Sequence, residues 1–69
     1  MTTKQVLDRI ETILRLAGKS AQPGRVLAVM LERGTYVPGA AEINLAALWV
    51  AVMIVEQADR DRWASERAG

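Results

Sequence analysis

Apolar residues recur at helical spacing through the first quarter of the chain. They follow the i, i+3, i+4 pattern of an amphipathic helix, and charged residues occupy most positions between them. Thr2 and Gln5 have the spacing of a capping box, and Gly18 is suited to the left-handed turn that ends many helices. We therefore expect a first helix over residues 3–17. Its apolar positions are Val6, Leu7, Ile10, Ile13, Leu14 and Ala17.

A second, shorter apolar segment follows a polar connection. Pro23 suits the first turn of a helix, where its missing amide proton is not needed, and Gly34 is suited to the turn that ends this helix. The pattern predicts a helix over residues 22–33 that packs on two sides. Its apolar positions are Val26, Leu27, Val29, Met30 and Leu31.

The remainder of the chain predicts one long helix over residues 39–67, because no glycine or proline occurs from Ala40 to Ala68. Its two halves differ in character. Leu45 to Val55 is a run of eleven consecutive apolar residues, whereas charged residues dominate from Glu56 to Arg67. The predicted fold is therefore all-α, a single domain over residues 1–69 with two short helices followed by a long one.

The apolar run of the long helix predicts a homodimer. A run that is apolar all the way round must be buried all the way round, and two short helices cover only part of it. We expect the rest to be covered by a second copy in an intertwined helical homodimer. A marginal monomer with exposed valine and leucine remains the alternative. The predicted dimer interface comprises Leu45, Leu48, Trp49, Val52 and Val55.

A membrane span is not expected. Eleven residues of helix extend about 16 Å, whereas the hydrocarbon core of a bilayer is about 30 Å thick. Extending the run upstream brings in Glu42 and Asn44, which a bilayer centre disfavours. An apolar leader is not expected either, because charged residues interrupt the first segment. We expect a cytoplasmic protein.

The composition limits the available chemistry. The chain has no cysteine and no histidine, which excludes disulfides, thiolate nucleophiles, imidazole bases and the usual zinc ligands. Ser20 and Ser65 therefore have no imidazole partner, and the carboxylates lie mostly beside arginines, where structural ion pairs are the default. We expect no catalytic site, no cofactor and no metal.

DNA binding is an alternative that the charge pattern disfavours. Nine basic residues against eight acidic ones give a net charge of +1, so nothing pulls the whole chain toward nucleic acid. A helix-turn-helix would comprise the second helix, the Gly34 loop and the start of the third. Residues 40–48, at the start of that reading helix, include Glu42 and Asn44 but no cation.

Tyrosine, tryptophan and arginine are the residue types enriched at protein interfaces, and they provide the candidate binding residues. Tyr36 follows Arg33 in the irregular segment between the second and third predicted helices, and Arg60, Arg62 and Trp63 cluster on the polar half of the long helix. We expect these five residues to contact a protein partner. Alternatively, Tyr36 folds into the core and Trp63 packs against the second copy.

The length, the absence of cysteine and the order of two short helices and a long one resemble small early proteins of temperate bacteriophages. More narrowly, the layout resembles the phage anti-quorum-sensing (anti-activator) proteins. The resemblance implies a homodimer that binds a LuxR-type regulator responsive to acyl-homoserine lactones, and also a type IV pilus assembly ATPase. It includes no specific motif and transfers no binding residue. The expected function is a non-enzymatic protein-binding inhibitor; a DNA-binding repressor or a subunit of a larger assembly are the alternatives.

Overall fold

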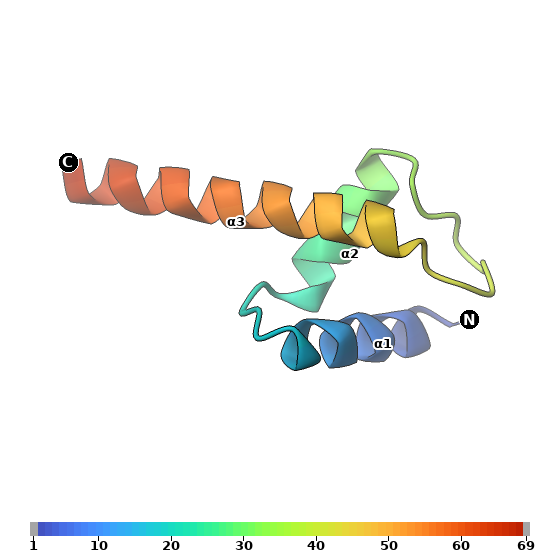
Figure 1. Cartoon of the computed structure of the whole chain (residues 1–69). Helices are drawn as coiled ribbons and strands as arrows, with labels where there is room; N and C mark the ends of the chain where they lie inside the picture. Colours follow the sequence, from blue (N-terminus) through green and yellow to red (C-terminus); the bar gives the residue numbers. More distant parts are fainter. Residues whose placement is uncertain (1, 69) are drawn as a thin grey trace.

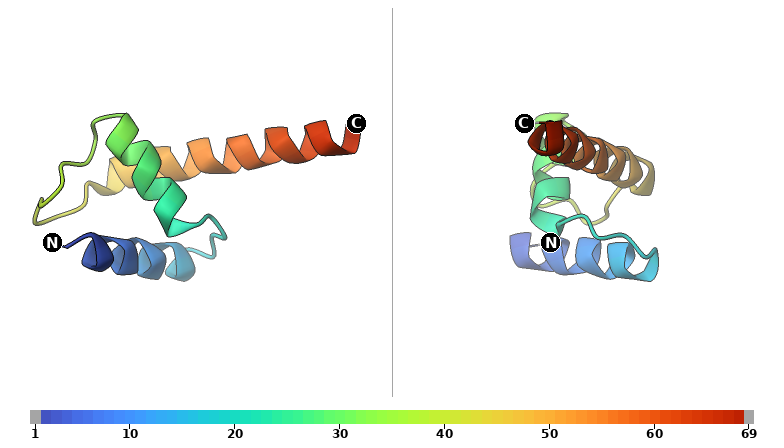
Figure 2. Two further views of the ribbon diagram at one scale, coloured as in Figure 1. Left: turned by 180° about the vertical axis from the view of Figure 1, so that it is seen from behind. Right: turned by 90° about the vertical axis from the view of Figure 1, so that its left-hand side faces the viewer.

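A computed structural model describes residues 2–68 and confirms the all-α class. Three helices follow one another: α1 (Thr3–Leu16), α2 (Pro23–Glu32) and α3 (Leu45–Ala68). The described residues contain no strand. The middle helix α2 packs on both α1 and α3, which lie on opposite sides of it (Figures 1 and 2). The chain therefore forms three layers, each one helix thick.

The helix ends follow from local sequence signals. The capping box at the start of α1 is present: the Thr2 amide donates to the Gln5 side chain at 2.8 Å, and the Gln5 amide donates to the Thr2 hydroxyl at 3.2 Å. Gly18 and Gly34 follow α1 and α2 with φ of 70° and 71°, the left-handed conformation that favours glycine. The amide after each glycine donates to a carbonyl in the last turn, at 2.8 and 2.9 Å.

The predicted start of the third helix is wrong. The helix begins at Leu45, and residues 40–44 are irregular although they contain neither glycine nor proline. Asn44 is the physical reason, because its side-chain oxygen accepts a hydrogen bond from the Ala47 amide at 3.1 Å. Asparagine is among the best residues at this capping position, and it satisfies an amide that has no partner within the helix.

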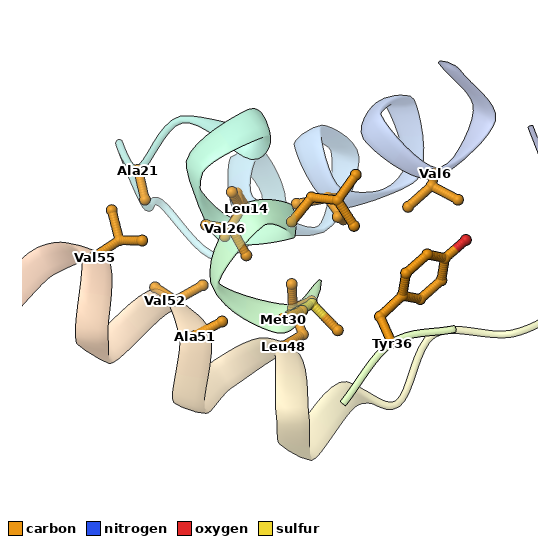
Figure 3. Close-up of a cluster of buried hydrophobic side chains, with 12 residues drawn as sticks. Val6, Leu14, Ala21, Val26, Met30, Tyr36, Leu48, Ala51, Val52 and Val55 are labelled. Atoms are coloured by element: carbon orange, nitrogen blue, oxygen red, sulfur yellow. The ribbon is translucent and has the colours of Figure 1, made fainter. Parts of the chain in front are cut away.

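The core is formed by one contiguous cluster in which α2 is central (Figure 3). Val26 and Met30 of α2 are completely buried, between the apolar stripe of α1 on one side and that of α3 on the other. No polar or charged residue of the described chain is buried. The core is therefore almost wholly aliphatic. Its members are Val6, Ile10, Leu14, Ala21, Val26, Leu27, Met30, Tyr36, Leu48, Ala51, Val52 and Val55.

The structure corrects the predicted dimer interface. Leu48, Val52 and Val55 are at most 2% exposed within a single chain, because they form the face of α3 that packs on α2. They are not available to a second copy. Of the predicted interface, only Leu45, which is exposed, and Trp49, which is half-buried at the edge of the core, remain accessible.

The molecule is elongated because α3 extends beyond the other helices (Figure 1). The radius of gyration is 12.8 Å, against about 11 Å for a compact domain of this length. The described chain measures 44 × 25 × 20 Å along its principal axes. We call residues 60–67 the arm, because every one of them is exposed.

Candidate protein-binding surface

Just before the arm begins, two ion pairs join α3 to the first turn of α2 and to the segment that precedes it. The Arg25 guanidinium donates a hydrogen bond to the Asp59 carboxylate, and Arg62 approaches the same oxygen at 3.0 Å. Lys19 lies 3.7 Å from Glu56, one turn earlier on α3. The Arg25 hydrogen bond is the main cause that holds the pKa of Asp59 below its ordinary value of 3.8; partial desolvation opposes this shift, and the charges of Arg25 and Arg62 reinforce it.

The lowered pKa of Asp59 predicts a loss of stability in acid. A carboxyl whose folded pKa is depressed stabilises the fold above its unfolded pKa, and this contribution is lost as the pH falls through the folded value. We expect the urea midpoint to fall less between pH 7 and pH 2 in Asp59→Asn than in the unmodified chain. Asp61→Asn is the matched control, because the Asp61 carboxylate forms no ion pair within residues 2–68. Equal acid sensitivity of both variants would contradict the role of the Arg25 pair.

The arm presents an exposed aromatic residue among arginines. Trp63 is 58% exposed, and the Arg67 guanidinium carbon lies 4.6 Å from the centroid of its ring. Arg60 and Arg62 flank it, and a shallow hollow opens between these side chains and Glu66. The structure thus brings Arg60, Arg62 and Trp63 to one surface. Their role in binding stays a prediction.

Tyr36 and Arg33 do not belong to this surface. Tyr36 is only 9% exposed, and its ring is directed toward Val6 of α1 (Figure 3). It is therefore a core residue, and its expected role as an exposed anchor is wrong. Arg33 is exposed, but it lies at the C-terminal end of α2, near the beginning of α3 and far from the arm (Figure 1).

A second exposed surface lies on α3 itself, on the side away from α2. Its large members are Leu45 at 53%, Val50 at 42%, Met53 at 67% and Ile54 at 36% exposed. We define the apolar face as Leu45, Ala46, Trp49, Val50, Met53 and Ile54. The sequence shows the surplus of apolar residues but misses Met53 entirely, because in a run that is apolar all round nothing local marks which side faces the chain's own core.

The apolar face is energetically expensive to leave in water. The exposed fractions of its four large side chains add up to about two fully exposed side chains. Burying that apolar surface would stabilise the chain by about 3–6 kcal/mol. A core of this size rarely supplies more than about 3–5 kcal/mol of net stability. Covering the apolar face would therefore change the free energy of unfolding by an amount comparable to the net stability that the core supplies.

The total accessible surface is large for a chain of this size. The chain exposes 4878 Å², whereas a compact monomer of 7.6 kDa exposes about 4,300 Å². The excess of about 600 Å² accompanies the projecting arm and the apolar face. Such an excess is expected where one helix extends beyond its neighbours, as α3 does.

The connection between α2 and α3 does not have the geometry of a helix-turn-helix. A helix-turn-helix joins its two helices by a turn of three or four residues, whereas residues 33–44 separate α2 from α3. The first turn of α3, which would read the bases, offers only leucine and alanine. Among residues 2–68, no helix is long and apolar enough to cross a membrane, and no group of three acidic residues could hold a metal ion.

Comparison with known proteins adds no family to this description. No protein-family model, no curated protein and no solved structure matches the chain. The candidate surfaces are therefore the arm around Trp63 and the apolar face of α3, and both rest on the exposure of their residues in the structure.

Proposed function

We propose that this chain is a non-enzymatic protein-binding inhibitor that docks as a homodimer on another protein and blocks its activity. The observation that supports the proposal best is the exposure of Trp63 on an arm projecting from the core. Exposing an aromatic ring of this size is unfavourable in water, and a well-packed tryptophan beside arginines is the usual centre of a binding hot spot.

The charges of the arm fit a protein partner better than a nucleic acid. Arg60, Arg62 and Arg67 alternate with Asp61 and Glu66, so the arm carries both signs at close spacing. Binding to a phosphate backbone depends on cations that neutralise several phosphates, and interleaved acids weaken that attraction. A mixed surface around an aromatic anchor is typical of protein interfaces, in which the outer charges set orientation and partner choice.

The resemblance to phage anti-quorum-sensing proteins suggests which targets to test first. These are a LuxR-type regulator responsive to acyl-homoserine lactones and a type IV pilus assembly ATPase. Both act in the bacterial cytoplasm, which is the proposed site of action. A purified regulator with its operator DNA allows inhibition to be measured as loss of DNA binding.

Replacing Trp63 by alanine tests the arm. We expect the unmodified chain to abolish operator binding at a ratio near one protomer per regulator subunit, and Trp63→Ala to raise the dissociation constant for the regulator at least about 30-fold, the loss typical of a hot-spot residue. Leu16→Ala is the control, because Leu16 is an exposed apolar residue on α1, away from the arm. Equal inhibition by Trp63→Ala and the unmodified chain would contradict the arm as the binding site.

The same titration tests separately whether the proposed targets bind the chain and whether that binding inhibits them. If neither the regulator nor the ATPase binds the unmodified chain, both proposed targets are wrong. If the regulator binds but keeps full operator affinity, the chain is a binding module and the proposed inhibition is wrong. Retention of operator DNA by the chain without the regulator would instead support the DNA-binding alternative.

A further inference from the structure

We propose that two copies of this chain pair through the apolar face, with their α3 helices antiparallel and the two-fold axis between Val50 and Met53. This pairing rests on the homodimer of the proposed function and specifies the surface that forms it. It replaces the interface expected from the sequence, of which three residues are buried in the chain's own core.

Three members of the apolar face belong to a longer exposed stripe with heptad spacing. Successive members are alternately four and three residues apart, which is the spacing of the contact seam in a pair of coiled helices. All of them are exposed, on the side of α3 away from α2. Two such stripes can therefore interdigitate without disturbing the core. The stripe comprises Ala46, Val50, Met53, Gln57, Arg60 and Ala64.

A second copy is the occupant that the face fits. Leu45 to Val55 contains no charged residue, so a matching uncharged surface of the same length is required, and an identical chain supplies one. Burying the four large exposed side chains of the apolar face stabilises each copy, and a pair of identical chains buries this face on both copies at once. Ala46 presents a small exposed side chain, which lets two helices approach closely.

The charges on α3 select the antiparallel orientation. In a parallel pair, Arg60 would face Arg60 across the seam, and like charges directly opposite each other are unfavourable. In the antiparallel pair, Val50 packs against the partner's Met53, and Ala46 against the partner's Gln57. The two Arg60 positions are then about 25 Å apart along the pair, so this repulsion is absent.

The antiparallel pair leaves the target-binding surface free. At 100° per residue, Trp63 lies about 110° around α3 from the centre of the stripe. Its ring therefore remains accessible at the side of the seam. The dimer displays two such rings, one near each end, so each arm can contact a target while the apolar faces cover one another.

Single cysteines test the orientation, because the chain has none of its own. With a short bifunctional maleimide, we expect Met53→Cys to crosslink efficiently to itself, and Ala64→Cys not to crosslink, because the two Ala64 positions are about 37 Å apart in the antiparallel pair. The double variant Ala46→Cys/Gln57→Cys should crosslink, whereas Ala46→Cys alone should not. Ala28→Cys, exposed on α2, measures background reaction.

Crosslinking of Ala46→Cys, Met53→Cys and Ala64→Cys to equal extents would show a parallel pair and overturn the proposal. Crosslinking no greater than that of Ala28→Cys at every position would exclude the face altogether. A charge on the face provides an independent test. We expect Met53→Glu to weaken dimerisation at least 100-fold, measured by light scattering. Its helix content, measured by circular dichroism, should not change, because Met53 lies outside the core.

The outcomes distinguish this pairing from the proposed function. If the unmodified chain is a dimer but Met53→Glu is one too, the face is wrong and the homodimer stands. If the unmodified chain is a monomer at tens of micromolar, both the pairing and the homodimer are wrong. Inhibition by the arm is measured separately with Trp63→Ala, so it can persist in either case.

Discussion

Replacing Tyr36 by alanine is expected to leave most of the protein unfolded. Its ring is buried beside Val6 and Met30, and deleting a buried aromatic side chain typically costs about 3–5 kcal/mol. That loss is comparable to the whole net stability of a domain of this size, about 3–5 kcal/mol. Urea unfolding followed by circular dichroism measures it, at one fixed protein concentration because the proposed pairing of two copies would contribute to the midpoint.

Tyr36→Phe separates the ring from its hydroxyl. The hydroxyl makes no hydrogen bond to another described residue, so we expect its removal to change the free energy of unfolding by less than about 1 kcal/mol. A folded Tyr36→Ala that has lost only its affinity for a target would instead show that Tyr36 is an exposed anchor, the role that the sequence suggested.

Leu48→Ala is expected to lower the free energy of unfolding by about 2–5 kcal/mol, through lost burial and the cavity left behind. Leu48 is completely buried on the side of α3 that packs on α2. A cavity at this position cannot close unless one of the two helices moves. The same urea experiment measures the change. It tests directly whether this side of α3 is the chain's own core.

Leu45→Ala is the matched control for Leu48→Ala. It removes the same atoms one turn earlier on the same helix, from a side chain that is largely exposed. With both variants measured in the Met53→Glu background, in which pairing through the apolar face does not contribute, we expect a change in the free energy of unfolding below about 1 kcal/mol for Leu45→Ala. A larger loss for Leu45→Ala than for Leu48→Ala would mean that the helix is rotated relative to the core described here.

The difference between these two leucines illustrates how far the sequence reaches. Both lie in the run from Leu45 to Val55, and both were assigned to the dimer interface because they fall on one stripe of the helix. The period of a helix predicts which residues share a stripe. It does not predict which stripe meets α2, because in this run every stripe is apolar.

The candidate site shows the same division. The cluster of Arg60, Arg62 and Trp63 could be predicted because neighbours in sequence on one helix are also neighbours in space. The position of Tyr36 could not, because it depends on how residues 35–38 fold back toward α1. Tyr36, which the sequence placed in a loop, is part of the core, whereas Trp63, which lies on α3, is exposed.

The sequence by itself determined the all-α class, the number of helices and the ends of the first two. Those features depend on contacts within a few residues, such as the Thr2 capping box and the left-handed glycines at positions 18 and 34. Only the tertiary structure decided which side of α3 is buried, that Tyr36 belongs to the core, and that the arm projects beyond α2. These features depend on contacts between distant segments, and a uniformly apolar helix satisfies such contacts equally well in several orientations until its neighbours select one.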